Sequence, residues 1–235
     1  MAASYIPLGG RVRLAVLALS FTALLAAAAI GFGFAELHVI DRIQAGEPVS
    51  DADLTAIDDR NLGMAIVGFA VWIFAAVAFI RWLHAAYFNV DVVAAAERRY
   101  GHGWAIGSWF VPILNFWRPK QIVNDVWRAG GRDVQDAQPG WLLLSWWGLW
   151  LFCDVVLRIA GSNYGSADTP EEWRTGTIIF LVGDGLSLIA AFLAIAVVRS
   201  STDRLDGRAA AKAAPPPEPP ADEPAERAVP AGATS

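Results

Sequence analysis

The sequence has little of what most catalytic and metal sites need. Its 235 residues include one cysteine, three histidines and two methionines. The single cysteine, Cys153, can form neither an internal disulfide nor a cysteine-based metal cluster. The sequence also lacks a phosphate-binding loop, a zinc-binding helix motif and a nucleophile elbow. We therefore predict no catalytic residue, no cofactor and no metal site, and we expect that the protein is not an enzyme.

Charge is also scarce, and this shortage argues against a soluble domain. Only 17% of the residues are charged, whereas 55% are hydrophobic, which is unusual for a soluble chain. The apolar residues lie in four blocks: two contain no charge, one contains only Asp184, and one reaches full length only if Asp154 is accepted within it. Runs of about 18 or more mostly apolar residues are typical of transmembrane helices. We predict an all-α fold, a four-span transmembrane helical bundle, with spans at about residues 13–37, 62–82, 140–160 and 175–198.

The first apolar block also resembles a signal peptide, because Arg11 and Arg13 precede it. Its charge-free core, residues 14–35, is much longer than the ~7–15 residues of a cleavable signal. The stretch GFGFAEL at 31–37 is a poor match to a small-x-small cleavage site. We therefore expect this block to remain as the first span.

The arginines and lysines predict how the chain is threaded through the membrane. Fourteen of the 18 precede the first span, lie between the second and third, or follow the fourth. Because basic residues concentrate on the cytoplasmic side, we predict a multi-pass protein of the cell membrane with cytoplasmic N- and C-termini. The basic inner face would suit anionic lipid headgroups, and nothing else in the sequence indicates binding to nucleic acid.

The C-terminal tail differs in composition from the rest of the chain. Seven of the thirteen prolines follow residue 200, in a stretch rich in alanine and poor in large apolar side chains. Such a segment cannot bury a core. We predict a membrane domain at residues 1–200 and a disordered tail at residues 201–235.

Residues 103–129, between the second and third spans, read GWAIGSWFVPILNFWRPKQIVNDVWRA. The first part, residues 104–117, carries no charge but is too short to cross a bilayer, and Pro112 is expected to bend or break it. The second part, from Arg118, places Ile122, Val123, Val126 and Trp127 on one helical face. A basic amphipathic helix next to a tryptophan-rich segment is typical of a membrane interface.

We therefore predict an amphipathic or re-entrant helical element at residues 103–129, on the cytoplasmic side of the membrane. The alternative, a helix buried in a soluble core, has no soluble domain that could bury it. Tryptophan suits headgroup depth because its ring is apolar and its N–H can find a partner there. The predicted membrane contacts are Trp104, Trp109, Trp117, Arg118, Lys120, Trp127 and Arg128.

Three stretches resemble a known bacterial membrane family. They are PLGG at 7–10, RWLHAAYFNV at 81–90 and, above all, GWAIGSWFVPILNFWRPKQIVNDVW at 103–127. Together they resemble the family called domain of unknown function 4328, over about residues 7–200. The resemblance implies a multi-pass membrane protein and implies no particular activity.

Charged residues inside the predicted spans are the remaining candidates for chemistry. Asp154 and Asp184 lie at roughly 20 and 21 Å from the inner surface, at 1.5 Å per residue, and Arg158 is one turn from Asp154. Charged groups within a bilayer are costly and usually pair inside protein. We therefore predict one cluster of Asp154, Arg158 and Asp184 between the third and fourth spans. Either it is a structural salt bridge, or it is a proton or cation site.

Two kinds of function fit these observations. The first is a non-catalytic integral membrane protein that acts as a scaffold, assembly partner or regulator. The second is a small transporter or channel subunit that uses Asp154 and Asp184, for which an oligomer would be needed because four spans leave little room for a pore. We favour the first. Its expected partners are the lipid bilayer, anionic headgroups on the cytoplasmic face, and an unidentified membrane protein or a second copy of the chain.

Overall fold

A computed structural model of the chain describes residues 4–94, 98–132, 136 and 138–214. This part of the chain is helical and contains no strand, which confirms the all-α prediction. Its α-helices are α1 (Gly9–Gln44), α2 (Asp51–Val93), α3 (Trp104–Gly107), α4 (Arg118–Ala129), α5 (Trp141–Gly165) and α6 (Pro170–Ala213). A short 3₁₀ helix, η1 (Leu114–Phe116), lies between α3 and α4.

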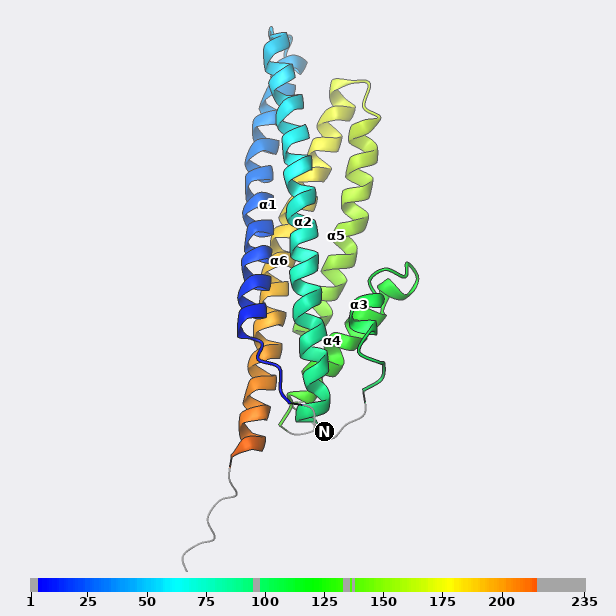
Figure 1. Cartoon of the computed structure of the whole chain (residues 1–235). Coiled ribbons are helices and arrows are strands. Elements are labelled where there is room, and N and C mark those ends of the chain that lie inside the picture. The colour runs from blue at the N-terminus through cyan, green and yellow to red at the C-terminus, as the bar shows by residue number, and fades with distance from the viewer. Residues whose placement is uncertain (1–3, 95–97, 133–135, 137, 215–235) are drawn as a thin grey trace, which may run out of the picture.

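Four of these helices, α1, α2, α5 and α6, are long and apolar enough to cross a membrane. They run along one another in an elongated bundle (Figure 1). The α1–α2 and α5–α6 connections lie at one end, which we call the loop end. The opposite end, where α1 begins and α6 finishes, we call the tail end. The prediction of four long apolar helices is confirmed, and each observed helix is longer than the span predicted for it.

The helices at the loop end begin at well-defined capping residues. The Ser50 hydroxyl accepts from the Asp53 N–H at the start of α2, and the Asp53 side chain accepts from the Ser50 N–H in return. Thr169 and Glu172 form the same reciprocal capping box at the start of α6. Each box satisfies backbone donors that a helix leaves unpaired in its first turn, so both helices begin at the end of a short polar loop.

Helix α6 is the centre of the bundle, since it packs along α1 on one side and along α5 on the other. Two glycines permit the close approach of α5. A Cβ added at Gly176 would lie 3.0 Å from the Tyr164 Cα, and one added at Gly183 would lie 2.7 Å from the Leu157 side chain. Tyr164 is therefore level with Gly176, and Leu157 with Gly183. Helix α2 packs chiefly against α1.

The best-buried apolar side chains gather toward the tail end. Trp82 and Leu83 of α2 and Val197 of α6 have no exposed surface. The Trp82 indole N–H donates to the Thr202 hydroxyl at 2.9 Å, so the polar atom of this buried ring is satisfied. The core thus lies where α2 and α6 continue beyond their most apolar stretches.

Helix α4 packs onto this core. Its Ile122, Val123 and Val126 side chains have no exposed surface, and the helix contacts both α2 and α6. The sequence interpretation placed this apolar face against the membrane interface, on the ground that no soluble part of the chain could bury it. The structure places it against protein, because α2 and α6 project past their spans and provide that surface.

Helix α4 ends against α6 at a position that requires glycine. A Cβ added at Gly130 would lie 2.6 Å from the Arg204 Cβ and 2.8 Å from its carbonyl carbon. Because one of these neighbours is backbone, no side chain can fit there without separating α4 from α6. Gly130, the residue after the end of α4, therefore sets how closely this helix docks on α6.

The first and last described residues also lie at the tail end. The Asn89 side chain of α2 accepts from the Ile6 N–H and donates to the Ile6 carbonyl, both at 2.8 Å, which fixes the N-terminal segment against α2. A disordered tail was predicted from residue 201, but α6 continues through Ala213. Ser201, Thr202 and Leu205 are buried, so packing rather than composition decides the structure there. Residues 215–235 of the predicted tail lie outside the described residues.

Candidate functional site

A buried carboxylate connects the four long helices near the loop end. Glu36 of α1 is only 4% exposed, and five donor groups from the other three helices surround it. The donors to its Oε1 are Tyr164 Oη at 2.9 Å, Trp173 Nε1 at 2.7 Å and Thr177 Oγ1 at 3.1 Å. The donors to its Oε2 are Arg60 at 3.1 Å and Asn61 Nδ2 at 3.0 Å.

We call these six residues the Glu36 cluster. The Arg60 guanidinium also lies over the Phe32 ring at 5.2 Å from its centroid. Hydrogen bonds to a charged acceptor are stronger than neutral ones, and a buried carboxylate is stable only when its oxygens are satisfied. The cluster therefore fixes the relative heights of α1, α2, α5 and α6 at the loop end.

Sequence reasoning gave Glu36 no role and missed the Glu36 cluster. One signal was available: Glu36 directly ends the first apolar run, and Arg60 stands just before the second. Two antiparallel spans joined by a short loop bring those ends together. The remaining donors are tyrosine, tryptophan, asparagine and threonine side chains, whose spacing carries no recognisable motif.

The structure brings together two of the three charged residues predicted within the spans. Arg158 contacts Asp154 through Nε at 2.9 Å and through a terminal nitrogen at 3.3 Å. The pair lies on the outside of α5, with the Asp154 and Arg158 side chains 55% and 77% exposed. Within the described part of the chain, no hydrogen bond or ion pair joins either of them to Asp184.

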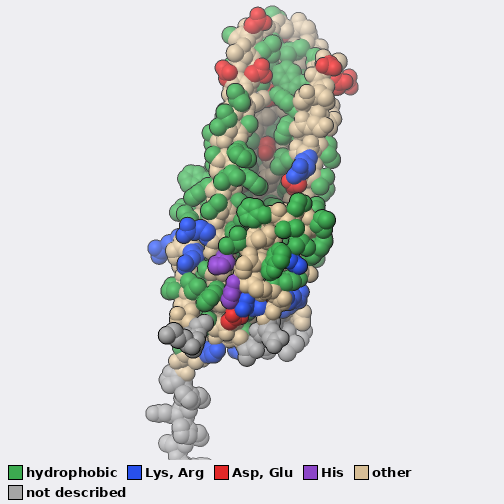
Figure 2. Space-filling view, turned by 45° about the vertical axis from the view of Figure 1, so that its right-hand side comes forward, with side chains coloured by type: hydrophobic (Ala, Val, Ile, Leu, Met, Phe, Trp, Pro, Cys, Tyr) green, Lys and Arg blue, Asp and Glu red, His purple; other side chains and the backbone are tan. Residues whose placement is uncertain are grey.

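Asp184 of α6 lies near the same depth as Asp154 of α5, but its side chain does not point toward α5. The neighbouring Gly183 packs against Leu157 of α5, and one residue step turns a side chain by about 100°, which directs Asp184 away from that contact. Asp184 is partly buried. Figure 2 shows a hollow between the helices toward the loop end, with an acidic side chain inside it.

The predicted membrane contacts separate into packed and exposed residues. The Trp109 ring lies edge-on to Phe79 of α2 and Trp150 of α5, each at 5.9 Å between ring centroids, so it fills the space between these helices. The Trp127 N–H donates to the Gln138 carbonyl at 3.1 Å. Trp104 and Trp117 are 37% and 44% exposed, and they remain available for contact with lipid.

The three basic residues of this segment have different surroundings. The Arg118 guanidinium lies over the Trp104 ring at 4.1 Å, and Arg128 pairs with Asp125 at 3.3 Å. Burial lowers the pKa of Lys120, and the nearby Arg128 lowers it further. Burial raises the pKa of Asp125, while Arg99 and Arg128 oppose that shift. Two of the three predicted cations are thus held by protein groups.

Between α3 and α4 the chain forms a projecting loop with an apolar surface. Phe110, Ile113 and Phe116 are 74%, 69% and 61% exposed. The Trp147 indole N–H of α5 donates to the Phe116 carbonyl at 3.1 Å, which holds the loop beside the bundle (Figure 1). Exposed apolar side chains in such a group mark a surface that contacts lipid or another protein.

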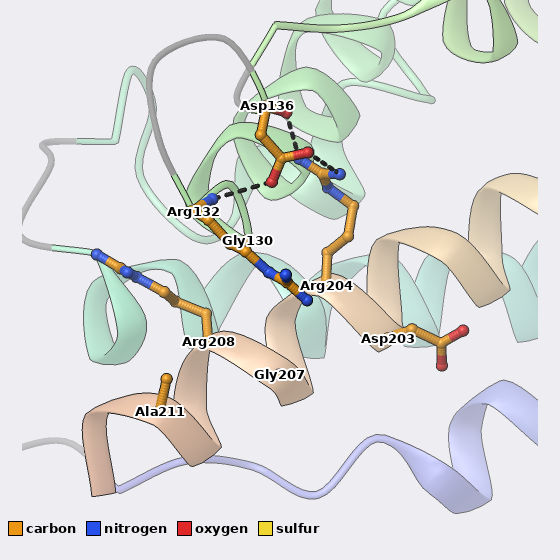
Figure 3. A pocket seen from close by; sticks show the side chains of 8 residues that line it. All are labelled: Gly130, Arg132, Asp136, Asp203, Arg204, Gly207, Arg208 and Ala211. Atoms are coloured by element: carbon orange, nitrogen blue, oxygen red, sulfur yellow. Dashed lines mark hydrogen bonds and ion pairs between the residues drawn. The ribbon is translucent and has the colours of Figure 1, made fainter. Parts of the chain in front are cut away.

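A pocket of about 540 Å³ lies at the tail end, where α4 and α6 meet (Figure 3). Arg204 donates to Asp136 Oδ1 at 2.9 Å, and the Arg132 N–H donates to Asp136 Oδ2 at 3.0 Å. These bonds hold the pKa of the Asp136 carboxyl below its usual range. Figure 3 shows the Arg132 side chain running toward α6 and the Arg208 side chain pointing away from it. The pocket is lined by Gly130, Arg132, Asp136, Asp203, Arg204, Gly207, Arg208 and Ala211.

The family profile described as domain of unknown function 4328 (DUF4328) matches residues 45–203. The chain belongs to the DUF4328 family. No curated protein and no solved structure matches it. The match begins before α2 and ends within α6, so it includes the Asp154–Arg158 pair, Asp184 and the exposed loop. Glu36 lies outside the match, although its five donors lie within it.

The described part of this DUF4328 protein holds no group of three or more histidine, cysteine or acidic side chains arranged to bind a metal ion. Its geometry instead fixes the long helices relative to one another. The Glu36 cluster fixes the helices at one end, and the packed core of α2, α4 and α6 fixes them at the other. The Asp154–Arg158 pair and Asp184 lie between these two ends.

Proposed function

We propose that this integral membrane protein is a non-catalytic scaffold or assembly protein, which acts through its tail end. The observation that carries the proposal is that the tail end is built as a folded platform. The core of α2, α4 and α6, the docked N-terminal segment and the pocket beneath α4 all lie there. The platform also carries the exposed apolar loop. These features provide a rigid surface next to the membrane, as a docking protein needs.

We further propose that the tail end faces the cytoplasm. Exposed arginines stand where three spans reach the tail end, namely Arg13 of α1, Arg81 of α2 and Arg199 of α6. About 32 Å separates Arg81 from Arg60 along α2 at 1.5 Å per residue, close to the ~30 Å thickness of a hydrocarbon core. The excess of basic residues at this end supports a cytoplasmic placement and contact with anionic headgroups of the cell membrane.

The topology can be tested with single cysteines in a Cys153→Ser background. We expect an impermeant thiol reagent, added outside intact cells, to label a cysteine at Glu47 and not one at Asn115. Residue 47 lies in the α1–α2 connection and residue 115 in the loop before α4. The same expectation covers the apolar loop, which we propose enters the membrane from the tail side and returns to it. Labelling of residue 115 from outside would contradict both the orientation and the re-entrant loop.

The scaffold role can be tested by affinity isolation in mild detergent. We expect the wild-type chain to retain a partner protein in fixed stoichiometry, and the double variant Arg132→Glu, Arg208→Glu to lose it, because both arginines line the pocket. The control variant Arg42→Glu, at the loop end, should retain the partner. Unchanged thermal unfolding of the variants would show that the fold is intact. Purification of the wild type with lipid alone would contradict a scaffold role.

A second candidate function is a small transporter or channel subunit. The observation that favours it is the position of Asp184, which lies in the middle of α6 and makes no hydrogen bond or ion pair within the described residues. An ionisable group in that position is often a proton or cation site. A proton-linked flux in reconstituted vesicles that Asp184→Asn abolishes, while the variant still folds, would favour transport over the scaffold.

A further inference from the structure

An ion pair stands on the exposed side of α5, within the third predicted span. Counted from Tyr164 in the Glu36 cluster, Arg158 and Asp154 lie roughly 9 and 15 Å deeper at 1.5 Å per residue. With 77% and 55% of these side chains exposed, nothing in the described part of the chain covers the pair. Ionised side chains in the hydrocarbon region almost always face protein or a water-filled cavity, so the surface of a single chain is incomplete here.

Two glycines continue the line of this pair toward the loop end. Asp154, Arg158, Gly161 and Gly165 are spaced by four, three and four residues, which places them on one stripe of the helix. Gly161 and Gly165 are both exposed, and a Cβ added at either would meet nothing within 4 Å. We call these four residues the α5 stripe. Two small residues four apart let a second transmembrane backbone approach closely.

The face of α5 next to the stripe is already occupied. At the level of the stripe its buried residues are Cys153 and Ala160, and the helix packs along α6 through Leu157 and Tyr164. Toward the tail end Trp147 lies on the line of the stripe, but there the loop before α4 contacts it through the Phe116 carbonyl. The α5 stripe is therefore a free face of a helix at the edge of the bundle (Figure 1). Closing that face requires a helix that brings a carboxylate and a cation to the same depth.

We propose that a second copy of this chain covers the α5 stripe and forms a parallel two-fold dimer. Both copies insert in the same direction, so the partner's Asp154 and the partner's Arg158 reach the required depth by symmetry. Each guanidinium can then bind the carboxylate of its own chain and Asp154 of the partner subunit, through its planar set of donors. In such an isologous contact the same patch serves both copies. Charge complementarity favours a second copy because its stripe carries both signs of charge. The dimer is independent of any partner held at the tail end.

Disulfide cross-linking in native membranes tests the dimer. In a Cys153→Ser background we expect Gly161→Cys and Gly165→Cys to form disulfide-linked dimers on mild oxidation. The control is Leu62→Cys, since Leu62 is 62% exposed and follows Asn61, which bonds to Tyr164 at 2.9 Å and so marks the same depth. We expect at least ten-fold less cross-linking at this position.

A charge variant tests the contribution of the ion pair separately from that of the glycines. Asp154→Asn with Arg158→Gln, added to Gly161→Cys, should reduce cross-linking several-fold, and Gly161→Ile in the native chain should shift dimer to monomer in native mass spectrometry from nanodiscs. Equal cross-linking at Leu62→Cys and Gly161→Cys, or a wild-type chain that is monomeric, would overturn the proposal. A Gly161→Cys cross-link to a protein of another mass would assign the stripe to that protein instead. Full cross-linking in the charge variant would show that the ion pair is not part of the interface.

Discussion

Replacing Glu36 by alanine is expected to lower the free energy of unfolding by about 3 kcal/mol, since removing one partner of a buried ion pair costs roughly 3–5 kcal/mol. The substitution leaves Arg60 without its carboxylate, with only 23% of its side chain exposed. It also leaves donors on three helices without their shared acceptor. Denaturation in mixed detergent micelles measures this change. We expect Glu36→Gln to lie between alanine and wild type, because it keeps the size of the side chain and one acceptor oxygen.

The matched control is Glu47→Ala. Glu47 pairs with Arg42 at 3.1 Å, the same distance that separates Arg60 from Glu36. The Arg42–Glu47 pair is solvent-exposed, with 34% and 56% of the two side chains accessible, and such pairs contribute about 0–1 kcal/mol. Equal losses for Glu36→Ala and Glu47→Ala would contradict the view that the Glu36 cluster holds the loop end together.

The parts of the fold that could be predicted from the sequence are those that depend on local composition. A run such as residues 14–35 has to be a helix in lipid, because a bilayer offers no partner for unpaired backbone groups. The same reasoning set the number of spans. These features need no knowledge of what lies beside each helix.

The features that could not be predicted depend on partners distant in sequence. The contact of Glu36 with Arg60 and Tyr164 can be predicted only when the relative heights of the helices are known. Glycine contacts such as Gly176 against Tyr164 set those heights. Asp154 and Arg158 could be paired from their spacing because both lie on one helix. Asp184 could be placed in depth by counting residues, but its direction depends on how α6 rotates against α5.

The position of α4 shows the same limit. Its apolar face was correctly located from the spacing of Ile122, Val123 and Val126, but periodicity cannot distinguish a lipid surface from a protein surface. The continuation of α6 through Leu205, which is fully buried, decides between the two. That stretch was assigned to the disordered tail because the prolines after residue 214 dominate its composition.

Replacing Ile122 by alanine is expected to lower the free energy of unfolding by about 3 kcal/mol, within the range of roughly 2–5 kcal/mol for truncating a buried isoleucine. The Ile122 side chain has no exposed surface and packs in the core shared with α2 and α6. Its loss leaves a cavity that the close contact at Gly130 keeps α4 from filling, since the backbones of α4 and α6 already touch there. Denaturation in mixed micelles again provides the measurement.

The chain supplies its own control in Ile113, the same residue type in the exposed loop before α4. Ile113 is 69% exposed, so Ile113→Ala removes exposed apolar surface and leaves the core intact. We expect it to change the free energy of unfolding by less than about 0.5 kcal/mol, as is usual for surface substitutions, and to reduce quenching of the nearby tryptophans by brominated lipids. If α4 lay on the membrane instead of on α2 and α6, the two alanine variants would behave alike in both measurements. If α4 packs on α2 and α6, only Ile122→Ala should cause a large loss of stability.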